Sequence, residues 1–106
     1  MYEKLKRTCK ALTQATDEDL EFIYTRSMPT TRKGNCTIGC MFQEMGYLKN
    51  CDFTLEVCYE LAERMGYIRA TAEELYENCR SCVKNGDGCC DNGSRLWKCL
   101  GKHSGH

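Results

Sequence analysis

Residues 36–48 read CTIGCMFQEMGYL and combine a regular apolar pattern with two cysteines four positions apart. The apolar residues recur at i, i+3, i+4, i+7 and i+10, which is the spacing of a helix with one buried face. The stripe consists of Ile38, Met41, Phe42, Met45 and Leu48. Gly46 can take the left-handed conformation that ends many helices, so the helix can stop slightly before Leu48. This stretch predicts a helix that packs on the core through its stripe.

The rest of the chain is also helical in pattern, with one proline, Pro29, in a loop. We expect a first helix over roughly residues 3–15 and a second one capped by Thr16 or Asp17. A capping box of Thr71 and Glu74 predicts the start of the fifth helix, and a short sixth follows a glycine-rich turn. The apolar members are Leu5, Cys9 and Leu12; Leu20, Ile23 and Tyr24; Leu55, Cys58, Leu61, Ala62 and Met65; Ala72, Leu75, Cys79, Cys82 and Val83; and Leu96, Trp97, Cys99 and Leu100. Residues 1–106 are therefore interpreted as one all-α domain of about six short helices.

Composition narrows the class of protein. Ten cysteines in 106 residues is an even number and a density typical of a disulfide scaffold, which favours a secreted, extracellular protein. No signal peptide is visible at residues 1–10, so we interpret the sequence as a mature form. Fifteen basic and fifteen acidic residues cancel, and no segment is long enough to span a bilayer. These observations favour neither a nucleic-acid partner nor membrane insertion.

Residues 85–93, NGDGCCDNG, raise the question of a metal site. An EF-hand loop starting at Asp87 fails, because its later ligand positions hold the wrong residues. Four thiolates from Cys79, Cys82, Cys89 and Cys90 could bind zinc, but this would use up cysteines needed for bridges. No phospholipase histidine follows the cysteine pair, and no GxSxG or HExxH motif is present. We therefore expect a turn without a metal or cofactor, in a protein that is not an enzyme.

Six of the cysteines carry a resemblance. Successive members are separated by 26, 3, 38, 10 and 8 residues: Cys9, Cys36, Cys40, Cys79, Cys90 and Cys99. This spacing resembles the signature of the insect pheromone- and general-odorant-binding proteins, and so do the stretches ATDEDL, MPTTRKGNC and CTIGCMFQEMGYL. The resemblance covers essentially the whole chain. It implies a compact bundle of about six helices around an apolar cavity.

The resemblance also implies three bridges, Cys9–Cys40, Cys36–Cys90 and Cys79–Cys99. Cys36 and Cys40 share one face of a helix, so they can bond to two different neighbours. Cys51, Cys58, Cys82 and Cys89 depart from the pattern. We expect two local bridges, Cys51–Cys58 if Thr54 caps the fourth helix and Cys82–Cys89 across the glycine turn, with a cross-pairing of these four as the main alternative.

The function that the resemblance implies is a carrier of small hydrophobic molecules such as odorants or pheromones. The residues expected to line its cavity are Leu20, Ile23, Ile38, Met41, Phe42, Met45, Leu55, Leu61, Met65, Leu75, Tyr76, Leu96, Trp97 and Leu100. The methionines suit ligands of varied shape, because thioether side chains are flexible. Tyr24, Tyr59 and Tyr76 are candidates for a hydrogen bond to the ligand.

A second hypothesis is a secreted protein-interaction module or effector with the same scaffold and a filled interior. A homodimer is compatible with either hypothesis. His103 and His106 titrate near neutrality, but terminal histidines are usually solvated. We therefore do not expect the short tail to act as a pH switch.

Overall fold

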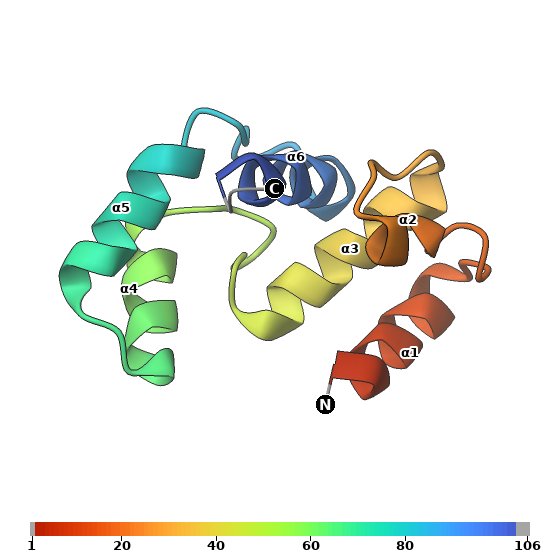
Figure 1. Ribbon diagram of the computed structural model, residues 1–106, viewed down its shortest axis with the longest axis horizontal. Helices are drawn as coiled ribbons and strands as arrows, with labels where there is room; N and C mark the ends of the chain where they lie inside the picture. Colours follow the sequence, from red (N-terminus) through yellow and green to blue (C-terminus); the bar gives the residue numbers. More distant parts are fainter. Residues whose placement is uncertain (1, 104–106) are drawn as a thin grey trace.

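The computed structural model describes residues 2–103, which form six α-helices and no strand (Figure 1). The helices are α1 (Tyr2–Thr13), α2 (Glu21–Thr25), α3 (Arg32–Met45), α4 (Leu55–Met65), α5 (Arg69–Cys79) and α6 (Cys89–His103). The radius of gyration is 13.2 Å, close to the ~13 Å expected of a folded chain of this length. The expectation of a compact, disulfide-linked all-α fold is confirmed.

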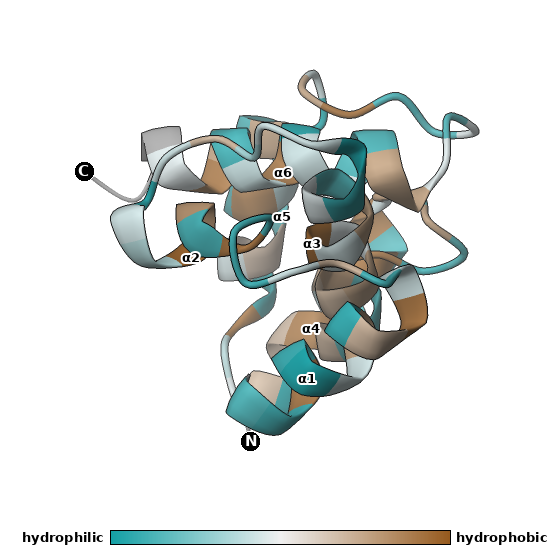
Figure 2. Cartoon of the chain, turned by 90° about the vertical axis from the view of Figure 1, so that its right-hand side faces the viewer, coloured by the Kyte–Doolittle hydropathy of each residue, from teal (hydrophilic) through white to brown (hydrophobic). Residues whose placement is uncertain are grey.

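Helix α3 is the centre of the arrangement. It packs against α1 on one side and α6 on the other, while α4 and α5 form an antiparallel pair that meets the rest through α6 (Figure 1). In the orthogonal view the apolar residues gather toward α3, and the outer side of α1 is hydrophilic (Figure 2). The α4–α5 pair is therefore the part of the molecule with the smallest attachment to the core.

The contact between α3 and α6 is close because glycines lie at the crossing. A Cβ on Gly93 would lie 2.4 Å from the Gly39 Cα, and one on Gly39 would lie 2.1 Å from the Cys89 carbonyl oxygen. Neither approach is compatible with a side chain, so the two helix backbones touch here. The Cys36–Cys90 disulfide joins the same two helices.

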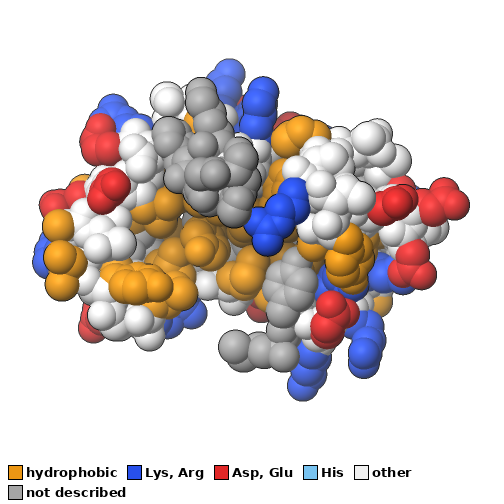
Figure 3. Space-filling view, in the orientation of Figure 1, with side chains coloured by type: hydrophobic (Ala, Val, Ile, Leu, Met, Phe, Trp, Pro, Cys, Tyr) orange, Lys and Arg blue, Asp and Glu red, His pale blue; other side chains and the backbone are white. Residues whose placement is uncertain are grey.

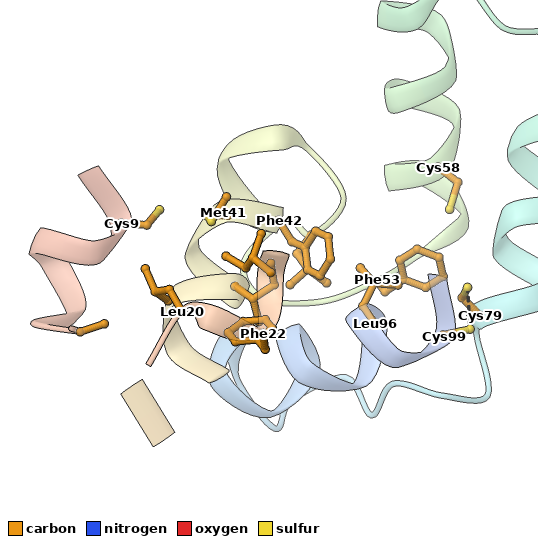
Figure 4. Packing of buried hydrophobic residues seen from close by; sticks show 14 of the residues in the cluster. Cys9, Leu20, Phe22, Met41, Phe42, Phe53, Cys58, Cys79, Leu96 and Cys99 are labelled. Carbon is orange, nitrogen blue, oxygen red and sulfur yellow. Dashed lines mark hydrogen bonds between the residues drawn. The ribbon is translucent and has the colours of Figure 1, made fainter. Parts of the chain in front are cut away.

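Buried side chains from α2, α3, α6 and the segment before α4 form one core (Figure 4). Phe22, Met41, Phe42 and Leu96 are each at most 4% exposed, and Phe53 is 2% exposed. Burying side chains of this size stabilises a fold by roughly 1.5–3 kcal/mol each. The stripe expected on residues 36–48 is therefore the central part of the core.

The predicted stops of α3 and α4 are confirmed. Gly46 (φ +90°) and Gly66 (φ +78°) take the left-handed conformation just after Met45 and Met65. Leu48 falls after the helix, yet it is only 2% exposed, because the chain folds back at Gly46. Thr54 caps α4 by accepting a hydrogen bond from the Val57 amide at 3.2 Å.

The expected start of the second helix is wrong. Thr16 and Asp19 hydrogen-bond to each other, since the Thr16 amide donates to Asp19 Oδ2 at 2.8 Å and the Asp19 amide donates to Thr16 Oγ1 at 3.2 Å. This reciprocal pair stabilises a turn, and α2 begins only at Glu21. Capping residues satisfy backbone amides in turns as readily as in helices. For this reason the Thr16-Asp17 pair wrongly indicated the start of a helix.

The last two helices also differ from expectation. Helix α5 begins at Arg69 after Ile68, without a side-chain cap, so the capping box of Thr71 and Glu74 is wrong. It ends at Cys79, which leaves Cys82 and Val83 beyond it. Helix α6 begins at Cys89 and runs for 15 residues, so the expected short helix is more than a turn longer at its start.

Candidate functional site

Three disulfides lie within the described residues. Cys9–Cys40 joins α1 to α3 and Cys36–Cys90 joins α3 to α6, as the resemblance implied. The third is Cys51–Cys89, which joins the segment before α4 to the start of α6. Through Cys40 and Cys36, helix α3 is thus bonded to two different helices, α1 and α6.

The two local bridges that we expected, Cys51–Cys58 and Cys82–Cys89, are wrong. Thr54 does cap α4, but Cys58 then faces the core, where it is 1% exposed. Cys51 lies three residues before the Thr54 cap, in a left-handed conformation with φ +67°. Its backbone amide donates a hydrogen bond to Gln43 Oε1 at 2.8 Å. The cross-pairing that we left open is therefore present at Cys51–Cys89.

The segment 85–93 is a structural connection. Asn85 exchanges two hydrogen bonds with the Phe53 backbone, at 2.9 and 3.1 Å. Asn92 is fully buried; it accepts from the Lys84 amide at 2.9 Å and donates to the Cys51 carbonyl at 3.1 Å. The residues that suggested a cation site instead form hydrogen bonds that connect the segment before α4 with the segment before α6.

The rival metal sites are not supported by the geometry. Cys89 and Cys90, two of the four suggested zinc ligands, are in disulfides. Asp87 and Asp91 pair instead with arginines, Arg95 and Arg32, at 2.8 and 2.7 Å. Across residues 2–103, no group of three or more His, Cys, Asp or Glu is arranged to hold a metal ion.

Four thiols remain, and they meet where α4, α5 and α6 come together. Cys79 and Cys99, the third pair implied by the resemblance, have their sulfurs 2.7 Å apart, without a covalent bond (Figure 4). Burial, together with the nearby Cys79, raises the pKa of Cys58 to about 12. Burial likewise raises the pKa values of Cys79 and Cys99.

The fourteen residues expected to contact a ligand fall into three groups. Seven are fully packed in the core: Leu20, Ile23, Ile38, Met41, Phe42, Leu61 and Leu96. Six are half-buried, with part of their surface accessible: Met45, Leu55, Leu75, Tyr76, Trp97 and Leu100. Met65 is 53% exposed at the end of α4. The half-buried group has surface that a ligand could cover.

Trp97 differs from the other half-buried residues. Its ring contacts Phe22 edge-on, with centroids 5.3 Å apart, and its Nε1 donates to the Ser27 carbonyl at 2.8 Å. This side chain attaches α2 and the following loop to α6. Both groups of its amphipathic ring are therefore already used within the protein.

The three candidate tyrosines lie in different surroundings. The Tyr24 hydroxyl accepts a hydrogen bond from Lys6, and the Tyr59 hydroxyl donates to Glu73 Oε2 at 2.7 Å. Tyr76 stacks on Phe53 with ring centroids 5.9 Å apart. Tyr76 is thus the candidate that lies against the core between the α4–α5 pair and α6.

Phe53 is a central residue that the sequence pattern did not identify. It precedes the Thr54 cap, and both Phe53 and Cys58, the fourth residue of α4, are buried (Figure 4). This is the arrangement of a hydrophobic staple, in which the residue before the cap packs on the fourth helical residue. The signal was available in the pair Phe53–Cys58, but we expected Cys58 to bond to Cys51 instead.

One pocket of about 670 Å³ opens between the end of α3 and α4. It is lined by Gln43, Gly46, Leu48, Lys49, Val57, Glu60, Glu63 and Arg64. Lys49 pairs with Glu60 at 3.6 Å, and an Arg64 nitrogen donates to the Met45 carbonyl at 3.1 Å. None of the fourteen expected residues lines it, and half of its lining residues are charged.

A different face gathers apolar side chains. Figure 3 shows a hollowed, mostly hydrophobic region between the α4–α5 pair and the side of the molecule that carries α3 and α1. Among residues 2–103 no helix is both long and apolar enough to cross a membrane.

The sequence and the fold were compared with those of known proteins. No curated protein sequence matches the chain. The fold is similar to that of the odorant-binding protein dmelOBP28a from Drosophila melanogaster, with a TM-score of 0.70 and 22% identity over 95% of this chain and 87% of that one. The sequence matches the PBP/GOBP family over residues 1–103, nearly its whole length. The chain is therefore a member of the PBP/GOBP family of insect odorant-binding proteins.

Proposed function

We propose that this protein is a secreted, non-enzymatic carrier that binds small hydrophobic molecules at the apolar face between the α4–α5 pair and α3. Membership of an odorant-binding family supports a carrier role in general. The observation that carries the proposal is the half-buried apolar group of Met45, Leu75, Tyr76 and Leu100, which comes from α3, α5 and α6.

The physical basis of binding is removal of apolar surface from water. Each Å² of ligand and protein surface that is buried contributes about 25 cal/mol. Because the disulfides already hold α1, α3 and α6 together, little ordering of these helices is needed on binding. Tyr76 packs against the core through its ring, and its hydroxyl is the polar group proposed to orient a ligand alcohol or carbonyl.

Displacement of a fluorescent apolar probe tests the proposal. We expect saturable probe binding to the oxidised protein, with a dissociation constant in the micromolar range or tighter, and competition by medium-chain apolar alcohols. Leu75→Arg places a charge on the proposed contact surface and should weaken probe binding at least about tenfold, which corresponds to ~1.4 kcal/mol.

The control is Leu12→Arg, at a residue of α1 that is 72% exposed. It adds the same charge outside the proposed face and should leave probe binding unchanged. Equal binding by Leu75→Arg and the unmodified protein would place the ligand elsewhere, and the 670 Å³ pocket beside Lys49 would be the next region to test. No saturable binding at all would favour the interaction-module hypothesis.

A further inference from the structure

Cys58, Cys79, Cys82 and Cys99 form a cluster of thiols at the junction of three helices, and we call it the thiol cluster. Cys58 lies in α4, Cys79 ends α5 and Cys99 lies in α6. Cys82 follows one turn later, since its amide donates to the Cys79 carbonyl at 3.0 Å. In Figure 4 the Cys58 sulfur points toward the pair formed by Cys79 and Cys99.

The distances within the cluster suit covalent bonding. The Cys79 and Cys99 sulfurs are 2.7 Å apart, whereas a disulfide is about 2.05 Å long. Cys58 belongs to the same buried cluster as Cys79 and Cys99, with its sulfur directed toward that pair (Figure 4), and Cys82 packs against this cluster. Cys51 and Cys89, the partners that we first expected for Cys58 and Cys82, are already bonded to each other.

Cys79–Cys99 is the third bridge that the resemblance implies, and it uses two of the four thiols. We propose that the other two close as a further disulfide, Cys58–Cys82, so that the oxidised protein has five bridges and no free thiol. Cys79–Cys99 follows from the sulfur separation. Cys58 and Cys82 are then the two remaining thiols, and both belong to the same packed region around Cys79. The new element is the bridge from α4 to the loop between α5 and α6. It does not depend on the proposed function.

The chemistry requires an oxidant, for which a small-molecule or protein disulfide suffices by thiol–disulfide exchange. Cys82 is half-buried, while the other three thiols are buried, so exchange begins at Cys82. Its thiolate attacks one sulfur of the oxidant's disulfide, which gives a mixed disulfide between Cys82 and that half of the oxidant and releases the other half as a thiolate. The Cys58 thiolate then attacks the Cys82 sulfur and releases the second thiolate. Two protons and two electrons leave the protein, and the oxidant's disulfide is reduced to two thiols.

The bridge would change how the α4–α5 pair is held. This pair meets the rest of the molecule through α5 and α6, and Cys51–Cys89 attaches only the segment that precedes α4. Cys58–Cys82 links α4 directly to the segment that leads into α6. One wall of the apolar face would thus be fixed covalently at both of its helices.

Peptide mapping of the oxidised protein tests the pairing. Alkylation under denaturing, non-reducing conditions should modify no cysteine. Trypsin releases Cys79 in residues 70–80, Cys82 in residues 81–84 and Cys99 in residues 99–102. We expect residues 70–80 linked to residues 99–102 as an isolated pair, and residues 81–84 joined to the Cys58 peptide, residues 50–64.

Three results would overturn the proposal: alkylated Cys58 and Cys82, four alkylated cysteines, or residues 81–84 linked to residues 99–102.

Cysteine-to-alanine variants at each partner of the proposed bridge provide a second test. Cys58→Ala should expose one thiol, at Cys82, and Cys82→Ala should expose one at Cys58. The double variant should have none. Because nine cysteines always leave one unpaired within a chain, the position of the free thiol decides: a free thiol at any other cysteine in a single variant would contradict the pairing.

Discussion

Asn92 connects two loops from inside the core. It is fully buried, and its amide group bonds to the Lys84 amide, the Lys84 carbonyl and the Cys51 carbonyl at 2.9–3.1 Å. Asn92→Ala leaves these backbone groups unpaired in the protein interior. We expect the free energy of unfolding to fall by about 2–4 kcal/mol in urea denaturation. Asn78→Ala, an exposed asparagine on α5, is the control and should change it by less than ~0.5 kcal/mol; equal effects would contradict this role.

Asp19 gives the fold a specific dependence on pH. Hydrogen bonds from the Thr16 backbone amide and then from the Thr31 hydroxyl hold the pKa of Asp19 below its usual value of 3.8. A carboxyl group whose pKa is lowered by folding stabilises the fold above its unfolded pKa, and this is lost as the pH falls through the native pKa. We expect Asp19→Asn to be less stable than the unmodified protein at pH 7 and equally stable at the lowest pH.

Urea midpoints measured from pH 7 down to about pH 2 would show this convergence, because the unmodified carboxyl is then protonated. Glu18→Gln, an exposed acid in the same turn, serves as the control. A stability difference between Asp19→Asn and the unmodified protein that stays constant over the whole range would mean that the charge of Asp19 plays no part.

At the scale of the helices, the α3–α6 crossing is the contact that fixes the core. A Cβ at Gly93 would lie 2.4 Å from backbone of α3, so the helices must move apart to accept one. We expect Gly93→Ala to lower the free energy of unfolding by about 2–4 kcal/mol, despite the higher helix propensity of alanine. Gly101→Ala on the same helix meets open space and should be neutral or slightly stabilising. Thermal unfolding of the two variants provides the comparison.

The helices show which features a sequence can predict. The stripe on residues 36–48 and the stops at Gly46 and Gly66 depend on local spacing and backbone preference, and they were predicted correctly. The start of α6 at Cys89 was missed, because CCDNG has the composition of a turn and is helical only through packing on α3. Cys51–Cys89 was left among alternatives, since the partner of Cys51 depends on tertiary placement. The sequence also did not show which apolar residues keep accessible surface, such as Met45 and Leu75, and which are fully packed.

The whole molecule consists of α1, α3 and α6, which disulfides hold together, and an α4–α5 pair with a smaller attachment to them. The apolar face lies between them (Figure 3). Side chains of Met45, Leu75 and Leu100 at the edge of the core remain half-buried, and theirs is the surface that the proposed ligand would cover. The side chain of His103 and the whole of His106 lie outside the described residues, so the expectation about the tail remains a prediction.

Isothermal titration calorimetry of the fully oxidised protein with a medium-chain apolar alcohol tests the carrier role most directly. Burial of apolar surface gives binding a negative heat-capacity change, whatever the sign of the enthalpy at one temperature. We predict one site per chain, a dissociation constant in the micromolar range or tighter, and a binding enthalpy that becomes more negative as the temperature rises. Absence of saturable binding for alcohols, esters and aldehydes alike, with the protein folded, would contradict the account.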